Sequence, residues 1–138
     1  MTTVSMTQQL AVPAQMVWTT IGGFNALPDW HPAVEKSDLE KGAEGTVRTL
    51  HLAGGGTIVE RLEKIDDKER LYSYSILEGP LPVANYTATI RVRDTGMGCE
   101  VEWSSEFEPA GASEGDATAA IRGIYQAGFE NLQKMFGG

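Results

Sequence analysis

The chain has 138 residues, of which 41% are hydrophobic and 22% charged, a balance that predicts one globular domain over residues 1–138. Its formal net charge of −8 argues against nucleic acid or an anionic membrane surface as a partner, because either would need a basic face. No apolar run approaches the ~20 residues that span a bilayer, and no charged-then-apolar leader opens the chain, so we expect no stable membrane insertion and a cytoplasmic location.

The first third of the chain predicts a strand, two short helices and a second strand. Apolar and polar residues alternate from Thr3 to Leu10, as in a half-buried strand. Pro13 can open a helix that Gly22-Gly23 ends. The prolines between Phe24 and Pro32 limit that segment to a short helical turn. Ala33 to Leu39 predicts a short strand.

A series of hairpins follows, in which turns rich in Gly, Pro and Asp separate alternating segments. The predicted strands cover residues 46–52, 57–65, 71–77, 84–93 and 99–107. With the two earlier strands they predict an antiparallel sheet of about seven strands.

The last segment, Ser113 to Phe136, predicts a long helix. Ser113 followed by Asp116 resembles a capping box, and Gly137 ends the helix. Its apolar residues recur at steps of three and four: Ile121, Ile124, Tyr125, Phe129, Leu132, Met135 and Phe136. A second stripe holds the small or polar residues Gly123, Ala127 and Asn131, which indicates either a close backbone approach or the wall of a cavity. The order of elements predicts an α+β domain with its helices on one side of the sheet.

The pleat of the predicted strands places a carboxylate on the inner face. Glu60 lies between Ile58 and Leu62, while the wetter set beginning at Val59 faces water. A buried carboxylate needs a cation, a hydroxyl, ordered water or a ligand. Two interpretations stay open: Arg48 or a tyrosine satisfies Glu60, or Glu60 stands on the wall of a small-molecule pocket.

Metal and thiol chemistry have little support in the sequence. His31 and His51 are the only histidines, and neither lies in a compact cluster of ligands, so we expect no metal and no other cofactor. The single cysteine, Cys99, cannot form an internal disulfide and is expected to be a small buried hydrophobe.

Five short motifs carry a resemblance to a known superfamily. They are Gly45-Thr-Val-Arg48, Glu60-Arg-Leu62, Asp66-Asp67, Asn85-Tyr86 and Asn131-Leu-Gln-Lys134. Through them the chain resembles the START-like (SRPBCC) superfamily, also called the Bet v 1-like or helix-grip fold, over nearly its whole length. It is most similar there to bacterial polyketide cyclase/dehydrase-like proteins, and more distantly to plant abscisic acid receptors. The resemblance implies a curved sheet wrapped around the long C-terminal helix.

The resemblance also implies site residues. Glu60 and Tyr86 match cavity residues of the receptors, and His31 falls where a receptor lysine meets the carboxylate of the ligand. Asn131 matches a polar cavity residue on the final helix, with Gly123 and Ala127 on the same stripe. The segments 53–56 and 78–83 depart from the gate and latch loops of the receptors, so hormone binding and phosphatase docking are not carried over.

We therefore expect a protein that binds a small hydrophobic molecule between the final helix and the sheet, in a cavity of roughly 300–1,000 Å³. Loops 53–56 and 79–83 would flank its mouth. The predicted ligand-binding residues are His31, Arg48, Leu50, Leu52, Ile58, Glu60, Tyr74, Tyr86, Ala88, Trp103, Gly123, Ala127 and Asn131.

The alternative is an enzyme of the polyketide cyclase/dehydratase type that needs no cofactor. Glu60 and His31 would exchange protons, and Tyr86 would polarise a carbonyl. Tyr125 and Phe129 are also candidates for a dimer contact, so the sequence leaves both a monomer and a homodimer open.

Overall fold

A computed structural model describes residues 1–43 and 45–137 of the chain. The elements follow in the order β1 (Thr2–Leu10), α1 (Ala14–Ile21), α2 (Leu27–Trp30), β2 (Val34–Gly42), β3 (Gly45–Leu52), β4 (Thr57–Asp66), β5 (Leu71–Glu78), β6 (Val83–Asp94), β7 (Cys99–Pro109) and α3 (Glu114–Phe136). The predicted order of helices and strands is confirmed. The main difference in bounds is at β2, which runs three residues beyond the predicted end at Leu39.

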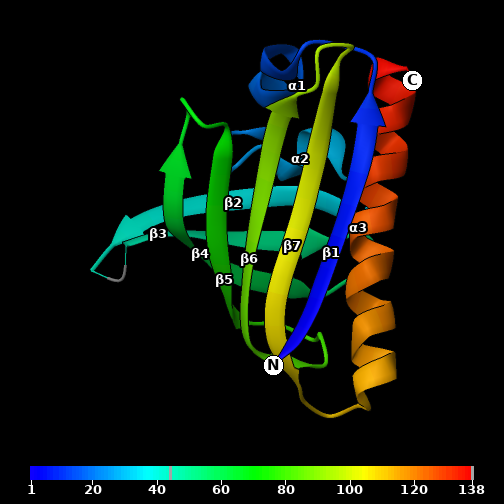
Figure 1. Cartoon of the computed structure of the whole chain (residues 1–138). Helices are drawn as coiled ribbons and strands as arrows, with labels where there is room; N and C mark the ends of the chain where they lie inside the picture. Colours follow the sequence, from blue (N-terminus) through cyan, green and yellow to red (C-terminus); the bar gives the residue numbers. More distant parts are fainter. Residues whose placement is uncertain (44, 138) are drawn as a thin grey trace.

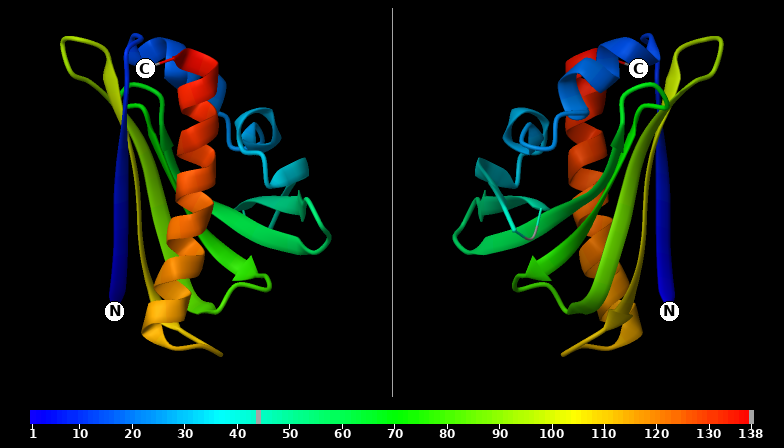
Figure 2. Two further views of the ribbon diagram at one scale, coloured as in Figure 1. Left: turned by 90° about the vertical axis from the view of Figure 1, so that its right-hand side faces the viewer. Right: turned by 90° about the vertical axis from the view of Figure 1, so that its left-hand side faces the viewer.

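The strands form one seven-stranded antiparallel sheet in the order β1-β7-β6-β5-β4-β3-β2. The sheet is strongly curved, and all three helices lie on its concave side, with α3 running beside β1 and β7 (Figures 1 and 2). The first strand pairs with the last, in the register Thr2↔Phe107 to Leu10↔Cys99. This is the helix-grip fold that the resemblance implied.

Irregular pairing supplies part of the curvature. The register shifts within β2, twice along β4, and between Ala84 and Thr87 in β6. Such bulges bend a strand and increase its twist. In β6 the shift coincides with Asn85, whose positive φ of 53° is a conformation that asparagine tolerates better than most residues.

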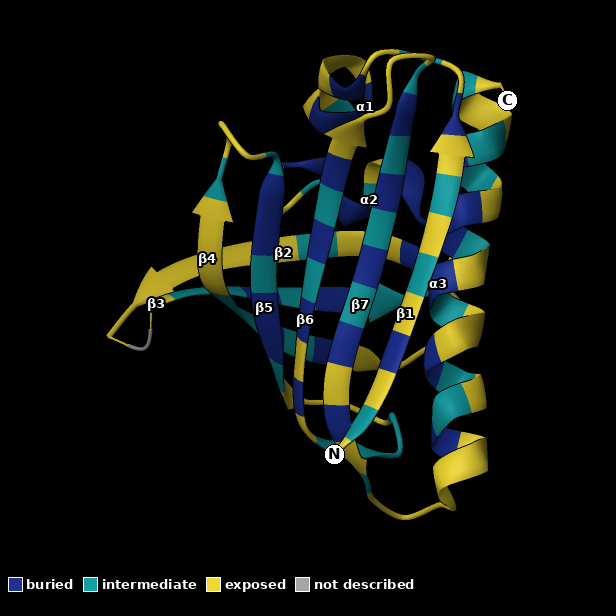
Figure 3. Cartoon of the chain, viewed as in Figure 1, coloured by how far each residue is buried: buried dark blue, intermediate teal, exposed yellow. Residues whose placement is uncertain are grey.

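Side chains alternate across the sheet as predicted. In β7 the inward set Cys99, Val101, Trp103, Ser105 and Phe107 is buried, and the residues between are half-buried or exposed. The same alternation gives the banded strands of Figure 3. The inner rows of β1 and β3 to β7, together with the apolar sides of the helices, form a single core.

Helix α3 begins and ends where the sequence predicts. The Ser113 hydroxyl accepts a hydrogen bond from the Asp116 amide at 3.1 Å, and Gly137 caps the other end. Tyr125 and Phe129 are completely or almost completely buried within the chain. Their assignment to a dimer contact is therefore wrong, because neither side chain reaches the surface.

Two further findings concern the described part of the chain. No helix in it combines the length and the apolar character needed to cross a membrane. Its histidines, cysteine and carboxylates do not gather into a group that could hold a metal ion.

Candidate functional site

A cavity of about 210 Å³ lies between the concave face of the sheet and helices α2 and α3. Its lining residues are mostly apolar and come from β2 to β7, both helices and three loops. They are Leu27, His31, Ala33, Val34, Leu50, Leu52, Ala53, Ile58, Glu60, Tyr74, Ile76, Leu81, Tyr86, Trp103 and Ile124.

The cavity is smaller than the predicted range of roughly 300–1,000 Å³. Aromatic side chains fill the rest of the space beneath α3. Trp103 stacks on Tyr125 with ring centroids 4.3 Å apart, and Trp30 lies 5.5 Å from Trp103. The remaining hollow is bounded by Trp103, by the aliphatic side chains of β3 and β4, and by one carboxylate.

The structure brings most of the predicted site residues together. Those that line the cavity are His31, Leu50, Leu52, Ile58, Glu60, Tyr74, Tyr86 and Trp103. Five others are not in its lining: Arg48, Ala88, Gly123, Ala127 and Asn131. Arg48 and Ala88 are buried beside it, whereas the other three belong to α3 and face elsewhere.

The stripe of small and polar residues on α3 does not face the cavity as predicted. The face of the helix that reaches the cavity is displaced from it by about one residue. Gly123 is exposed, and a Cβ atom added there would meet nothing within 4 Å. Ile124 is the residue that reaches the cavity, and one residue turns the helix by about 100°. The close backbone approach is at Gly128, where an added Cβ would lie 2.9 Å from His31 Cδ2 and from Trp30 Cζ3.

His31 is held by both nitrogens of its ring. Nδ1 accepts a hydrogen bond from the Ala33 amide at 3.1 Å, and Nε2 lies 2.7 Å from the Ile124 carbonyl oxygen, to which it donates. Burial lowers the pKa of His31, partly offset by the bond to Ile124, so the imidazole is neutral. His31 therefore cannot supply the positive charge that the resemblance to the receptors implied at this position. With both nitrogens bonded, it is also not free to exchange protons with a ligand.

Asn131 also has a structural role. Its Nδ2 donates to the carbonyl oxygen of Trp30, the last residue of α2, at 2.7 Å. Together with the His31–Ile124 bond, this contact fastens the end of α2 to α3. The predicted role of Asn131 in lining the cavity is not supported by its position.

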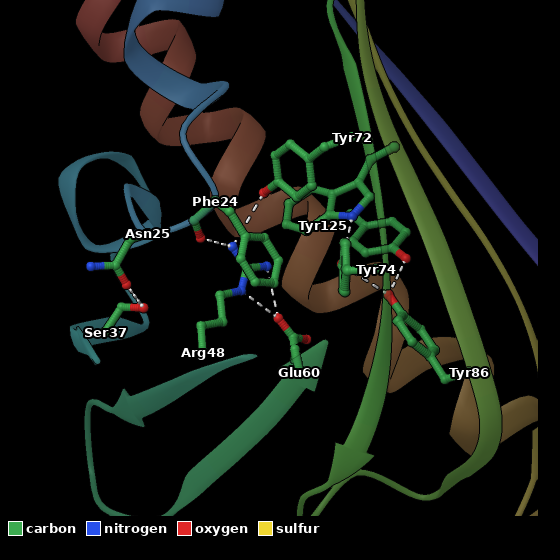
Figure 4. A network of polar contacts seen from close by, with 10 residues as sticks. Phe24, Asn25, Ser37, Arg48, Glu60, Tyr72, Tyr74, Tyr86 and Tyr125 are labelled. Carbon is green, nitrogen blue, oxygen red and sulfur yellow. Dashed lines mark hydrogen bonds and ion pairs between the residues drawn. The ribbon is translucent and has the colours of Figure 1, made fainter. Parts of the chain in front are cut away.

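Arg48 and Glu60 form a buried ion pair at the cavity wall (Figure 4). The two residues lie directly opposite each other on β3 and β4. Arg48 Nε donates to Glu60 Oε1 at 2.9 Å, and Nη2 lies 2.7 Å from the same oxygen. Nη1 donates to the Phe24 carbonyl and to the Tyr72 hydroxyl, and the guanidinium lies 4.1 Å from the centroid of the Phe24 ring.

Arg48 satisfies only half of the Glu60 carboxylate. Both contacts between Arg48 and Glu60 are to Oε1, and within the described residues no hydrogen bond reaches Oε2. Burial raises the pKa of Glu60, and the Arg48 cation opposes that rise. Burial also disfavours the Arg48 cation, but the Tyr72 hydroxyl and the Glu60 carboxylate outweigh it and raise its pKa. Arg48 stays charged in proteins and its Nη2 lies 2.7 Å from Glu60 Oε1, so the ionised pair has no net charge.

A chain of hydroxyls begins beside this pair, at Tyr74 on the neighbouring strand β5. Trp103 Nε1 donates to the Tyr74 hydroxyl at 3.0 Å, which lies 3.3 Å from the Tyr86 hydroxyl. The Tyr86 hydroxyl in turn makes a short hydrogen bond with that of Tyr125. Burial raises the pKa of Tyr74 and Tyr86 well above the usual value, so both stay neutral. Tyr86 faces inward in phase with the buried residues Ala88, Ile90 and Val92 of β6.

Sequence reasoning missed several residues of the site. Leu27, Val34 and Ile124 line the cavity, and Tyr125 joins the hydroxyl chain. Ile124 and Tyr125 both belong to the apolar stripe of α3, which was the available signal. The stripe alone does not show how far the helix is rotated about its axis.

A second hollow is larger but has different chemistry. It has a volume of about 520 Å³ and lies on the outer face of the sheet, where Val47, Thr49, Val59 and Arg61 are only half-buried. It is open, and polar side chains form much of its wall. The lining of the inner cavity is mostly apolar by comparison.

Comparisons with known proteins agree with the fold. A family described as "Polyketide cyclase / dehydrase and lipid transport" matches residues 1–137. The chain is 27% identical to MLP-like protein 423 of Arabidopsis thaliana, over 88% of this chain and 85% of that protein. It is 30% identical to the abscisic acid receptor PYL2 of the same plant, over 94% and 73%. The solved structure of the protein XoxI from Bacillus cereus superposes with a TM-score of 0.93 and 41% identity, covering 99% of this chain and 96% of that one.

Proposed function

Because this chain belongs to the polyketide cyclase/dehydrase and lipid transport family, we propose that it binds a small hydrophobic molecule in the cavity beneath α2 and α3. The observation that carries the proposal is the combination of a mostly apolar hollow beneath the helices with a carboxylate oxygen on its wall that accepts no hydrogen bond from the described residues. Small-molecule sites are generally apolar clefts with a few placed polar groups.

The walls suit an apolar ligand. Leu50, Ile58 and Trp103 are almost fully buried although they border empty volume. A ligand that fills this volume would gain contacts with these side chains. The name of one relative, an abscisic acid receptor, gives independent support for small-molecule binding within the family.

The same geometry does not favour acid-base catalysis. The alternative of an enzyme needs His31 to exchange protons with Glu60, and both His31 nitrogens are already bonded to the backbone. A proton added at Nδ1 would break the bond from the Ala33 amide. We therefore propose binding and not turnover.

Native mass spectrometry of the protein as isolated, followed by an NMR titration with toluene, tests the proposal. Leu50→Trp would fill the cavity, and Leu39→Trp, at an exposed position on β2, is the matched control. We expect a retained molecule or toluene to shift the amide signals near Ile58 and Ile124 in the native and control proteins only. Toluene shifts that persist in a folded Leu50→Trp variant, or no shifts at these residues in the native protein, would contradict binding in this cavity.

A further inference from the structure

We propose, on the basis of the binding function above, that the cavity selects an uncharged ligand that donates a hydrogen bond to Glu60 Oε2. The inference rests on three features of the wall: its balance of charge, its one vacant acceptor and its size. Each is independent of what the relatives bind.

The first feature is charge balance. Arg48 and Glu60 cancel each other, and the lining contributed by the described residues holds no lysine or arginine. His31 is neutral with both nitrogens engaged, and the tyrosine hydroxyls are neutral. An anionic or cationic ligand would therefore leave one uncompensated charge in an apolar enclosure, which is strongly unfavourable.

The second feature is the vacant acceptor. The contacts from Arg48 converge on Oε1, so Oε2 is left for whatever occupies the cavity. Glu60 is 5% exposed and lines the hollow. A ligand that cannot donate would displace any water there and leave a carboxylate oxygen without a partner. A hydroxyl or N–H donor restores that bond, and its strength is increased by the charge on the carboxylate.

The third feature is size. At the packing density of a protein interior, a cavity of about 210 Å³ holds about ten non-hydrogen atoms. Tyr74, Tyr86 and Trp103 present aromatic surface to that volume. A phenol or a compact alcohol with one ring matches all three features.

The test compares four ligands with one ring each: p-cresol, toluene, benzoate and benzylammonium. The readout is NMR titration at pH 7 of the full chain, where p-cresol is neutral because phenols ionise near pH 10. We expect p-cresol to bind about tenfold more tightly than toluene, since a hydrogen bond to a charged group offsets the desolvation of the hydroxyl. Benzoate and benzylammonium should cause no shifts around the cavity.

Two double variants separate the carboxylate from general effects. Arg48→Met with Glu60→Leu removes both charges and keeps the interior apolar, a change that proteins often tolerate. It should bind toluene while losing the tenfold preference for p-cresol. Arg61→Met with Glu63→Leu removes a neighbouring surface ion pair of β4 and should leave the preference unchanged.

The outcomes distinguish the two proposals. If toluene binds in the cavity as tightly as p-cresol, or if benzoate binds there, the selection for a neutral donor is overturned and the binding function stands. If p-cresol keeps its preference in the Arg48→Met/Glu60→Leu variant, Glu60 is not the acceptor. If none of the four ligands shifts the signals of the cavity residues, both proposals fail.

Discussion

Replacing Arg48 by methionine would leave the Glu60 carboxylate buried without its cation. Arg48 is completely buried and Glu60 is 5% exposed, so little water can take over the lost contacts. Removing one partner of such a pair costs about 3–5 kcal/mol of unfolding free energy. For a chain of this length, that loss corresponds to a melting temperature lower by roughly 10–20 °C.

The loss should depend on pH in a defined direction. Burial already raises the pKa of Glu60 above its ordinary value of 4.5, and Arg48 limits the rise. In the Arg48→Met variant, Glu60 therefore keeps its proton in the folded state over a pH range in which Glu60 of the unfolded chain has released it. The unfolding free energy of the variant is then highest below pH 4.5 and falls as the pH rises toward the folded pKa, by up to about 1.4 kcal/mol per pH unit.

Urea denaturation at pH 5 and pH 7 measures both effects. The gap between native protein and Arg48→Met should be smaller at pH 5, and the Arg48→Met/Glu60→Leu variant should recover most of the stability. A loss below about 1 kcal/mol at pH 7, or a gap independent of pH, would refute a buried and ionised pair.

Three further predictions concern the contact between α2 and α3. Gly128→Ala should destabilise the fold by about 1–2 kcal/mol, because the added Cβ would lie 2.9 Å from His31 Cδ2. Gly123→Ala, at an open position on the same helix, should stabilise the fold by up to about 1 kcal/mol. Thermal unfolding of the two variants measures the difference. Folding lowers the pKa of His31 from 6.5, so the contribution of the neutral imidazole to the unfolding free energy is complete above pH 6.5. That contribution is lost as the pH falls through the pKa of the folded state. In urea titrations, a His31→Gln variant should not show this loss of stability at low pH. Asn131→Ala should cost about 1 kcal/mol by removing the bond to the last carbonyl of α2, and unchanged stability would show that this bond contributes nothing.

Local patterns in the sequence determine much of the fold. The alternation in β7 and the cap at Ser113 depend on neighbouring residues, so both could be predicted together with the inward direction of Glu60. Arg48 could be named as one candidate partner, beside a tyrosine, because the hairpin places Arg48 and Glu60 on one face of adjacent strands.

The parts that could not be predicted depend on contacts between distant segments. The rotation of α3 follows from the fit of Gly128 against His31 and Trp30, about a hundred residues earlier in the chain. The two backbone bonds of His31 and the stacking of Tyr125 on Trp103 also need the assembled fold. Cavity volume is the small difference between a large enclosed space and the side chains that fill it, so residue types alone do not give it.

The fastening of α2 to α3 has a consequence for how a molecule would enter. The hydrogen bonds from His31 and Asn131 keep the end of α2 in contact with α3, so we expect no opening between these two helices. The lining also includes Ala53 and Leu81 from two loops, and no backbone hydrogen bond joins these two residues within the described part of the chain. We therefore expect a ligand to enter between the loops that hold Ala53 and Leu81. Amide hydrogen exchange should be faster in these loops than at the ends of α2.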